Sequence, residues 1–178
     1  QIANTLGCKL NGPQFPPDFH FPHQKLKESV NTKTRLIVLI NPNNPTGTSV
    51  SLEQIEDILK SFPDIPLLVD EAYYEFTGET CVSLLSNYPK LILVRTFSKA
   101  LALSSLRLGY IIANQEFILE LQKIRGPYDV NSVAVIAARE QLNLPEHWQK
   151  TVRHLMDESK PALEKYFEEK QVRYFSSK

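Results

Sequence analysis

The stretch KLILVRTFSKALALSSLRLGYIIA, residues 90–113, decides the fold. It begins with one apolar run, residues 90–96, and ends with another, residues 106–113, and each is typical of a buried β-strand. Two further runs of this kind lie earlier in the chain, RLIVLI at 35–40 and PLLVD at 66–70. Continuous apolar runs rich in branched residues are typical of strands buried on both faces, so we expect a parallel type of sheet.

Helical patterns alternate with these runs. SLEQIEDILKSF, residues 51–62, is amphipathic, with Ser51 as the predicted N-cap and Gln54 completing a capping box. Further helices are expected at 115–125 and 131–142. Strands alternating with helices predict an α/β fold with a mostly parallel sheet.

The remaining segments are a proline-rich connection from residue 11, a short helix at 23–31 and a long helix at 146–170. Pro161 is expected to bend or break that long helix. The first ten residues read as a helix tail, a stop at Gly7 and a short strand, and the last seven begin like a strand. Both ends look cut, so we expect a piece of a longer protein.

Composition narrows the possible partners. The chain has 178 residues, 42% of them hydrophobic, and a formal net charge of zero. It therefore offers no electrostatic reason to bind nucleic acid or an anionic membrane, and no apolar run is long enough to span a bilayer. Cys8 and Cys81 are far apart and favour reduced thiols of a cytoplasmic protein, and no signal peptide is recognised.

The polar residues that could act on a ligand lie at and between the facing ends of the two apolar runs of the opening stretch. Lys99 follows the hydroxyls of Thr96 and Ser98, and Arg107 comes eight positions later, after a nearly uncharged segment. A lysine beside apolar residues usually extends along the surface. The hydroxyls and the arginine indicate instead a site that holds a phosphate and uses an amine.

Two other expected strands also end in polar residues, with Asn44 shortly after the first and Asp70 on the second. Ligands of parallel sheets bind at the carboxyl ends of strands, so these groups should converge. An amine, a carboxylate, the phenol of Tyr73, an amide and a phosphate cup together fit pyridoxal 5′-phosphate (PLP). No metal site is predicted, because His20 and His23 lie among prolines without a third ligand.

Five blocks carry a family resemblance: NPNNPTG (41–47), VDEAYYEF (69–76), RTFSKA (95–100), LRLGY (106–110) and GPYDVNS (126–132). In this order and spacing, they resemble the fold-type I PLP-dependent aminotransferases. Within that superfamily the chain is most similar to the histidinol-phosphate aminotransferase branch.

The resemblance implies a role for each matching residue. Lys99 matches the lysine that forms a Schiff base with the cofactor and then shuttles a proton, and Asp70 matches the acid paired with the pyridine nitrogen. Tyr73 and Asn44 match the phenol and the amide that bind the ring hydroxyl. The expected phosphate contacts are Thr96, Ser98 and Arg107.

Each position also has an ordinary structural interpretation. Asp70 could cap the next element, Arg107 could form a surface ion pair, and Asn44 could be a turn residue. Tyr73 could be a core aromatic, and Glu71 is interpreted as a structural acid. Their joint occurrence in one order favours the cofactor site.

The resemblance implies a three-layer, mostly parallel sheet of the PLP-binding large domain, incomplete at both ends. Residues 1–170 would form part of that domain, and 171–178 would begin the small domain. The implied reaction transfers an amino group from histidinol phosphate to 2-oxoglutarate, in a homodimer, with this piece inactive alone. Open alternatives are a threonine-phosphate-type decarboxylase, another amino-acid aminotransferase, and a non-catalytic binding or regulatory protein.

One segment departs from the family pattern. Ala102, Ser104 and Ser105 stand where family members often carry glycine or other flexible residues. Either the loop lies differently, or these positions need no special backbone conformation. Asp129 likewise stands where the family usually has an amide, and Tyr128 and Asn131 receive no catalytic role.

Overall fold

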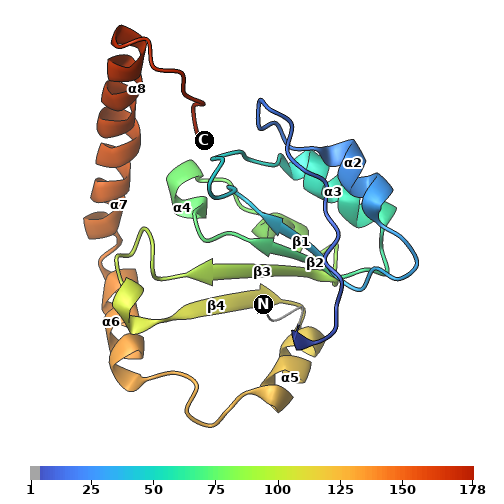
Figure 1. The fold of residues 1–178 in the computed structure, drawn as a ribbon. Coiled ribbons are helices and arrows are strands. Elements are labelled where there is room, and N and C mark those ends of the chain that lie inside the picture. The colour runs from blue at the N-terminus through green and yellow to red at the C-terminus, as the bar shows by residue number, and fades with distance from the viewer. Residues whose placement is uncertain (1–4) are drawn as a thin grey trace.

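Four strands form the sheet in a computed structural model that describes residues 5–178 (Figure 1). The order is β1–β2–β3–β4, with β1 to β3 parallel and β4 antiparallel to β3. Their bounds are β1 Ile37–Ile40, β2 Leu67–Asp70, β3 Leu91–Thr96 and β4 Gly109–Ala113. The predicted α/β fold with a mostly parallel sheet is confirmed.

The fourth strand begins later than the sequence predicts, at Gly109 instead of Leu106. The cause is local: Ser104–Leu106 forms the 3₁₀ turn η2, and Arg107 has a left-handed φ of 53°. Neither conformation can continue a strand ladder.

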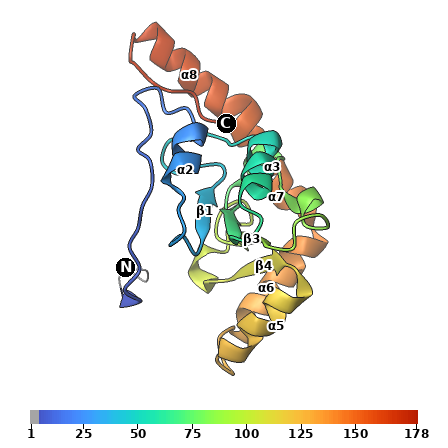
Figure 2. The same cartoon turned by 90° about the vertical axis from the view of Figure 1, so that its right-hand side faces the viewer.

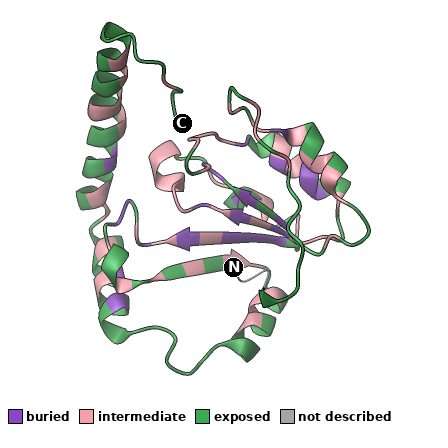
Figure 3. Ribbon diagram, viewed as in Figure 1, coloured by how far each residue is buried: buried purple, intermediate pink, exposed green. Residues whose placement is uncertain are grey.

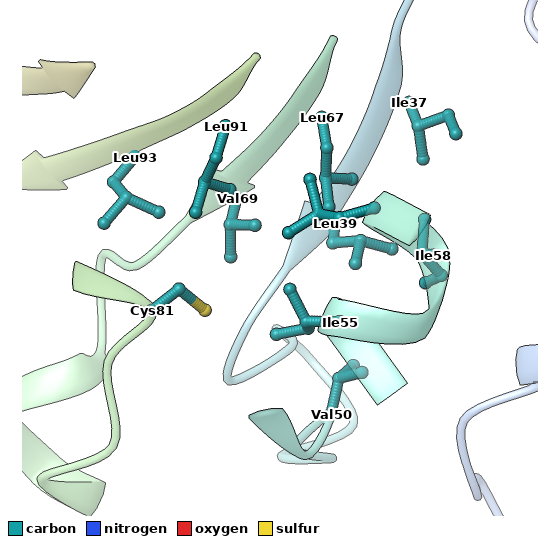
Figure 4. Close-up of a cluster of buried hydrophobic side chains, with 11 residues drawn as sticks. Ile37, Leu39, Val50, Ile55, Ile58, Leu67, Val69, Cys81, Leu91 and Leu93 are labelled. Carbon is teal, nitrogen blue, oxygen red and sulfur yellow. The ribbon is translucent and has the colours of Figure 1, made fainter. Parts of the chain in front are cut away.

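The main core lies between one face of β1 to β3 and the helices α2 (His23–Ser29) and α3 (Leu52–Ser61). Ile55 and Ile58 of α3 are fully buried there (Figure 4). The strands contribute alternate residues, Ile37, Leu39, Leu67, Val69, Leu91 and Leu93. Burying side chains of this size stabilises the fold by about 1.5–3 kcal/mol each, which fixes the strands and therefore their carboxyl ends.

The opposite face of the strands is more exposed, although Ile92 of β3 is buried there. Val38, Ile40 and Ile111 are 53%, 40% and 41% exposed. Figure 3 shows the contrast between the buried central strand β3 and the exposed β4. Of the three layers expected, the described residues therefore supply the sheet and the helical layer over the main core.

The predicted capping box is confirmed in detail, and a second helix has a cap that was not predicted. Ser51 Oγ accepts a hydrogen bond from the Gln54 N–H at 3.3 Å, and Gln54 Oε1 accepts one from the Ser51 N–H at 3.1 Å, which completes the capping box of α3. Asn131 caps α6 through the Ala134 backbone at 2.8 Å. The next helices in the chain are α5 (Gln115–Ile124) and α6 (Ser132–Asn143).

The long C-terminal helix is interrupted before Pro161. α7 (Pro145–Arg153) continues through a π-helical segment, η3 (His154–Ser159), into α8 (Lys160–Glu169), and Figure 1 shows them as one column. Proline has no N–H to donate and its ring crowds the carbonyl four residues earlier. The turn preceding Pro161 is therefore wider than an α-helical turn, which is the form that the expected break takes.

The two ends of the described chain differ from the sequence expectation. Residues 8–10 and 172–178 form no strand, and the tail returns to the first loop, where Lys178 donates to the Gly47 carbonyl at 2.9 Å. The trace that precedes α2 runs apart from the sheet in Figure 2. Residues 1–4 of the expected helix tail lie outside the described residues, whereas Thr5 is helical and Gly7, with a φ of 70°, follows as the expected helix stop. Among the described helices, none has the length and apolar character needed to cross a bilayer.

Candidate active site

The carboxyl ends of β1, β2 and β3 lie side by side. Ile40, Asp70 and Val94 are neighbours in the ladder. The pairing continues one residue further, because the Asn41 N–H donates to Asp70 O at 2.9 Å and the Glu71 N–H donates to Val94 O at 2.8 Å. The loops that follow these strands thus leave from one edge of the sheet, and they carry the predicted site residues.

Three of those residues come together at this edge. The Asn44 amide donates to the Tyr73 hydroxyl at 2.7 Å, although 29 positions separate them. The Lys99 ammonium lies 5.3 Å from the centroid of the Tyr73 ring. Asn44 and Lys99 are exposed and Tyr73 is half-buried, so the group faces solvent.

The loop that carries Asn44 is held by a buried amide. Asn41 is 6% exposed; its Nδ2 donates to Val50 O at 3.0 Å and its Oδ1 accepts from the Val50 N–H at 2.8 Å. This pair of bonds closes the loop across its base. The sequence analysis missed Asn41, and the available signal was an amide directly after a buried strand.

Asp70 ends β2 between two residues that face the core, Val69 and Glu71. Because successive strand side chains alternate, its carboxylate lies on the open face of the sheet. Oδ1 accepts from the Ala72 N–H at 3.0 Å, which fixes the side chain over the start of its own loop. The alternative in which Asp70 caps the next element is not realised, because the N-cap residue of the following helix, Tyr74–Thr77, is Tyr73; Asp70 keeps the position expected of a ligand contact.

The expected phosphate residues lie where the chain doubles back between β3 and β4. Thr96 Oγ1 accepts from the Ser98 N–H at 3.1 Å and approaches Leu108 O at 3.4 Å. The Arg107 guanidinium is exposed and donates from Nη1 to Ser104 O at 3.1 Å, which uses one of its five N–H groups. Thr96 pairs with Gly109 in the ladder, and Arg107 lies two residues before Gly109 in the chain.

A buried ion pair lies behind the edge. Glu71 is 1% exposed and Arg95 is 8% exposed, and Arg95 Nε donates to Glu71 Oε2 at 2.9 Å. Burial opposes the charge on Arg95, but hydrogen bonds with Tyr110 and Glu71 raise its pKa above the usual value. Glu71 has the structural place that the sequence analysis expected, whereas Arg95 was missed.

Two other ionisable groups, the Cys81 thiol and the Glu75 carboxyl, lie close to this pair, and burial raises the pKa of both. Burial raises the pKa of the Cys81 thiol to about 12, so it stays protonated. Glu75 lies on α4 (Tyr74–Thr77), and burial raises the pKa of its carboxyl to about 7. Among the described residues, Glu75 Oε2 has no hydrogen-bond partner.

The GPYDVNS block lies beside the loop between β3 and β4. Asn131 Nδ2 donates to Leu106 O at 3.3 Å, while Tyr128 is 94% exposed. Arg125 donates from Nε to Asp129 Oδ2 at 2.6 Å and from Nη2 to Oδ1 at 3.0 Å, and these hydrogen bonds lower the pKa of that carboxyl. The departure at Asp129 thus has a local partner.

Comparison with known families decides the class of protein. The family model for aminotransferases of class I and II matches residues 7–172. The chain belongs to this family. The match covers all the loops described above, so the predicted family resemblance is confirmed.

Individual known proteins are similar over most of this chain. Histidinol-phosphate aminotransferase 2 of Hydrogenovibrio crunogenus is 38% identical over 99% of this chain and 48% of its own length. Histidinol-phosphate aminotransferase from Sinorhizobium meliloti, solved in complex with pyridoxal-5′-phosphate, is 25% identical with a TM-score of 0.77, over 84% of this chain and 42% of that one. L-threonine-O-3-phosphate decarboxylase from Porphyromonas gingivalis is 29% identical with a TM-score of 0.67, over 75% and 42%. This chain spans at most about half the length of these proteins.

Proposed function

We propose that this chain is part of a PLP-dependent aminotransferase, and that it supplies much of the cofactor site. Residues 1–170 would belong to the PLP-binding large domain and 171–178 to the start of the small domain. The observation that carries the proposal is the meeting of Asn44, Tyr73 and Lys99 at the edge where Asp70 ends β2.

The donor set fits this cofactor group by group. Asp70 would pair with the ring nitrogen, and the Asn44 amide and the Tyr73 phenol, already 2.7 Å apart, would share the ring hydroxyl. Lys99 would bind the aldehyde. The groups that would hold the phosphate are Thr96, Ser98 and Arg107. When bound, the cofactor supplies an electron sink for the carbon that loses its proton.

The residues of the chain supply the rest of the chemistry. The face of the Tyr73 ring attracts the Lys99 ammonium, which keeps this flexible side chain beside the edge. The freed Lys99 amine would accept a proton from the substrate Cα and would donate it to the cofactor carbon that carries the aldehyde. Asp70, fixed by the Ala72 N–H, would keep its charge directed at the bound ring.

The proposed reaction is transfer of the amino group of histidinol phosphate to 2-oxoglutarate by a cytoplasmic homodimer. The 38% identity to a histidinol-phosphate aminotransferase over nearly the whole chain supports this choice of substrate. The second candidate is decarboxylation of a phosphorylated amino acid, which the 29% identity to L-threonine-O-3-phosphate decarboxylase supports.

The test begins with PLP and this chain. We expect an absorbance band at ~420 nm, which is characteristic of PLP imines. Lys99→Ala should abolish this band. Absence of the band from the wild-type chain and from a full-length parent contradicts the cofactor assignment. In the parent, glutamate formed from histidinol phosphate and 2-oxoglutarate supports the aminotransferase. Release of CO₂ from a phosphorylated amino acid, with no glutamate, supports the decarboxylase.

A further inference from the structure

The ion pair of Glu71 and Arg95 lies directly beside the proposed site in the sequence and directly behind it in space. Glu71 follows Asp70, and Arg95 precedes Thr96, on neighbouring strands. The side chains are 1% and 9% exposed, so both charges are withdrawn from water. Because strand residues alternate, this pair lies on the core face while Asp70 and Thr96 lie on the open face.

Glu71 closes the loop that carries the phenol. Its Oε1 accepts from the Cys81 N–H at 2.6 Å, and the Thr80 hydroxyl contacts Oε1 and Oε2 at 3.0 and 2.9 Å. The first residue of the loop is thereby bonded to its last two residues. Tyr73 lies inside this closed loop, two positions after Glu71.

Arg95 connects the same loop to the strand that leads to the amine. Its Nε and Nη2 atoms both lie 2.9 Å from Glu71 Oε2, and Nη2 donates to Thr80 Oγ1 at 2.5 Å. The guanidinium carbon lies 3.8 Å above the centroid of the Tyr74 ring. Tyr74 is the neighbour of Tyr73, so its stacking fixes the backbone from which the phenol extends.

The stability of the fold does not by itself require such a pair. Well-packed apolar residues of similar volume often match or exceed the stability of a buried ion pair, because both charges must be desolvated. The pair instead restricts geometry. Its planar, hydrogen-bonded groups allow only one arrangement of the loop after β2 relative to β3.

We propose that Glu71 and Arg95 are positioning residues, which set Tyr73 and its partner Asn44 relative to Lys99. This inference rests on the proposed function, because the geometry it sets is that of the PLP site. Neither residue reaches the open face where the cofactor would lie. Their effect is transmitted through the loop of Tyr73 and through the Tyr74 ring.

The experiment separates positioning from stability with a pair of neutral variants. Glu71→Gln and Arg95→Gln each leave one buried charge without a partner, whereas the double variant leaves none. Ile58→Ala removes a fully buried side chain of α3 from the main core, and it is the control for a loss of stability without a change at the ion pair. For each protein, urea unfolding, the dissociation constant for PLP, and the pH midpoint of the bound-PLP absorbance band are measured.

We expect the double variant to regain stability relative to the single variants, yet to bind PLP at least about tenfold more weakly than wild type, by analogy with the loss of partners behind metal-ligating residues. Its pH midpoint should also shift, because the phenol and the amide no longer meet the ring hydroxyl in the same way. Ile58→Ala should lose stability with an unchanged midpoint. A double variant with wild-type affinity and midpoint overturns the inference.

Failure of the proposed function is recognised separately. If the wild-type chain binds no PLP, a crystal structure of the double variant decides the inference. Loss of the 2.7 Å contact between Asn44 and Tyr73 then supports it, and retention of that contact overturns it.

Discussion

The loop after β2, residues 71–81, is anchored by a buried carboxylate, whereas the loop after β3, residues 97–108, is anchored by its own backbone. Glu71 alone bonds Thr80, Cys81 and Arg95. In the second loop, the Phe97 N–H donates to Leu108 O at 3.1 Å, and the Leu103 N–H donates to Phe97 O at 2.9 Å.

The second loop also contains two residues other than glycine in the left-handed region, Ala102 and Arg107, with φ of 57° and 53°. Such conformations cost free energy for residues with a Cβ. One loop is thus fixed by a buried carboxylate. The other combines packing of Phe97, Ala100 and Leu101 against Ala138 and Val152 with a backbone path that two of its own residues disfavour. Substitutions should therefore act in opposite directions in the two loops.

The largest effect is expected from Arg95→Leu. This change leaves the Glu71 carboxylate buried without its cation, and such losses cost about 3–5 kcal/mol of unfolding free energy. Urea unfolding followed by circular dichroism measures it. The control is Glu120→Gln, which removes the exposed partner of Lys123 and should change nothing measurable. A loss from Arg95→Leu no larger than that of the control would show that the first loop does not depend on the pair.

The next effect is expected from Gly109→Ala, where the second loop enters β4. A Cβ at Gly109 would lie 2.7 Å from the Arg95 carbonyl oxygen, so the two strands must separate. Overpacking of this kind costs about 1–3 kcal/mol. Gly126→Ala is the matched control, because a Cβ there meets nothing within 4 Å. Equal unfolding midpoints for the two variants contradict the close approach of β3 and β4.

A smaller, pH-dependent effect is expected from Glu75, a carboxyl in the first loop that lacks the partners of Glu71. Burial raises its pKa from 4.5 to about 7, so the folded state holds its proton more tightly than the unfolded state. The unfolding free energy should therefore be highest below pH 4.5 and fall as pH rises to about 7. Allowing for partial solvent screening, the expected decrease is about 1–2 kcal/mol.

Glu75→Gln tests this expectation, because the amide cannot ionise. Its unfolding free energy should lack the decrease between pH 4.5 and 7 and exceed that of wild type at pH 8. The charged neighbours Glu71 and Arg95 remain in place in this variant. A variant and a wild-type protein with the same pH profile would show that Glu75 is not buried in the folded state.

The sequence predicted the elements whose signals are local. The apolar runs gave β1 to β3, and Ser51 with Gln54 gave the start of α3, because a strand pattern and a capping box each lie within a few residues. The loops at the strand ends were also predicted to converge, since parallel strands place their carboxyl ends at one edge.

The sequence could not reveal what depends on distant partners. The role of Arg95 depends on Glu71, which lies 24 positions away, and that of Asn41 on Val50 across its loop. The last seven residues, 172–178, begin like a strand in sequence but form none, because pattern alone does not say whether a neighbouring strand exists to pair with them. Assignment of the cofactor residues came from the family resemblance, and their chemical roles remain predictions.

The smallest expected effect is a gain, from Ala102→Gly. The sequence left open whether this position needs a special backbone conformation, and the structure gives Ala102 a φ of 57°. Glycine relieves the left-handed strain but loses more freedom on folding, so the net gain should be about 0.5–1 kcal/mol. Ala100→Gly is the matched control two residues earlier, where a buried side chain is removed and stability should fall. If Ala102→Gly instead destabilises the chain as Ala100→Gly does, then the left-handed conformation of Ala102 stores no strain that glycine can relieve, and the contrast between the two loops fails at the residue where it is most specific.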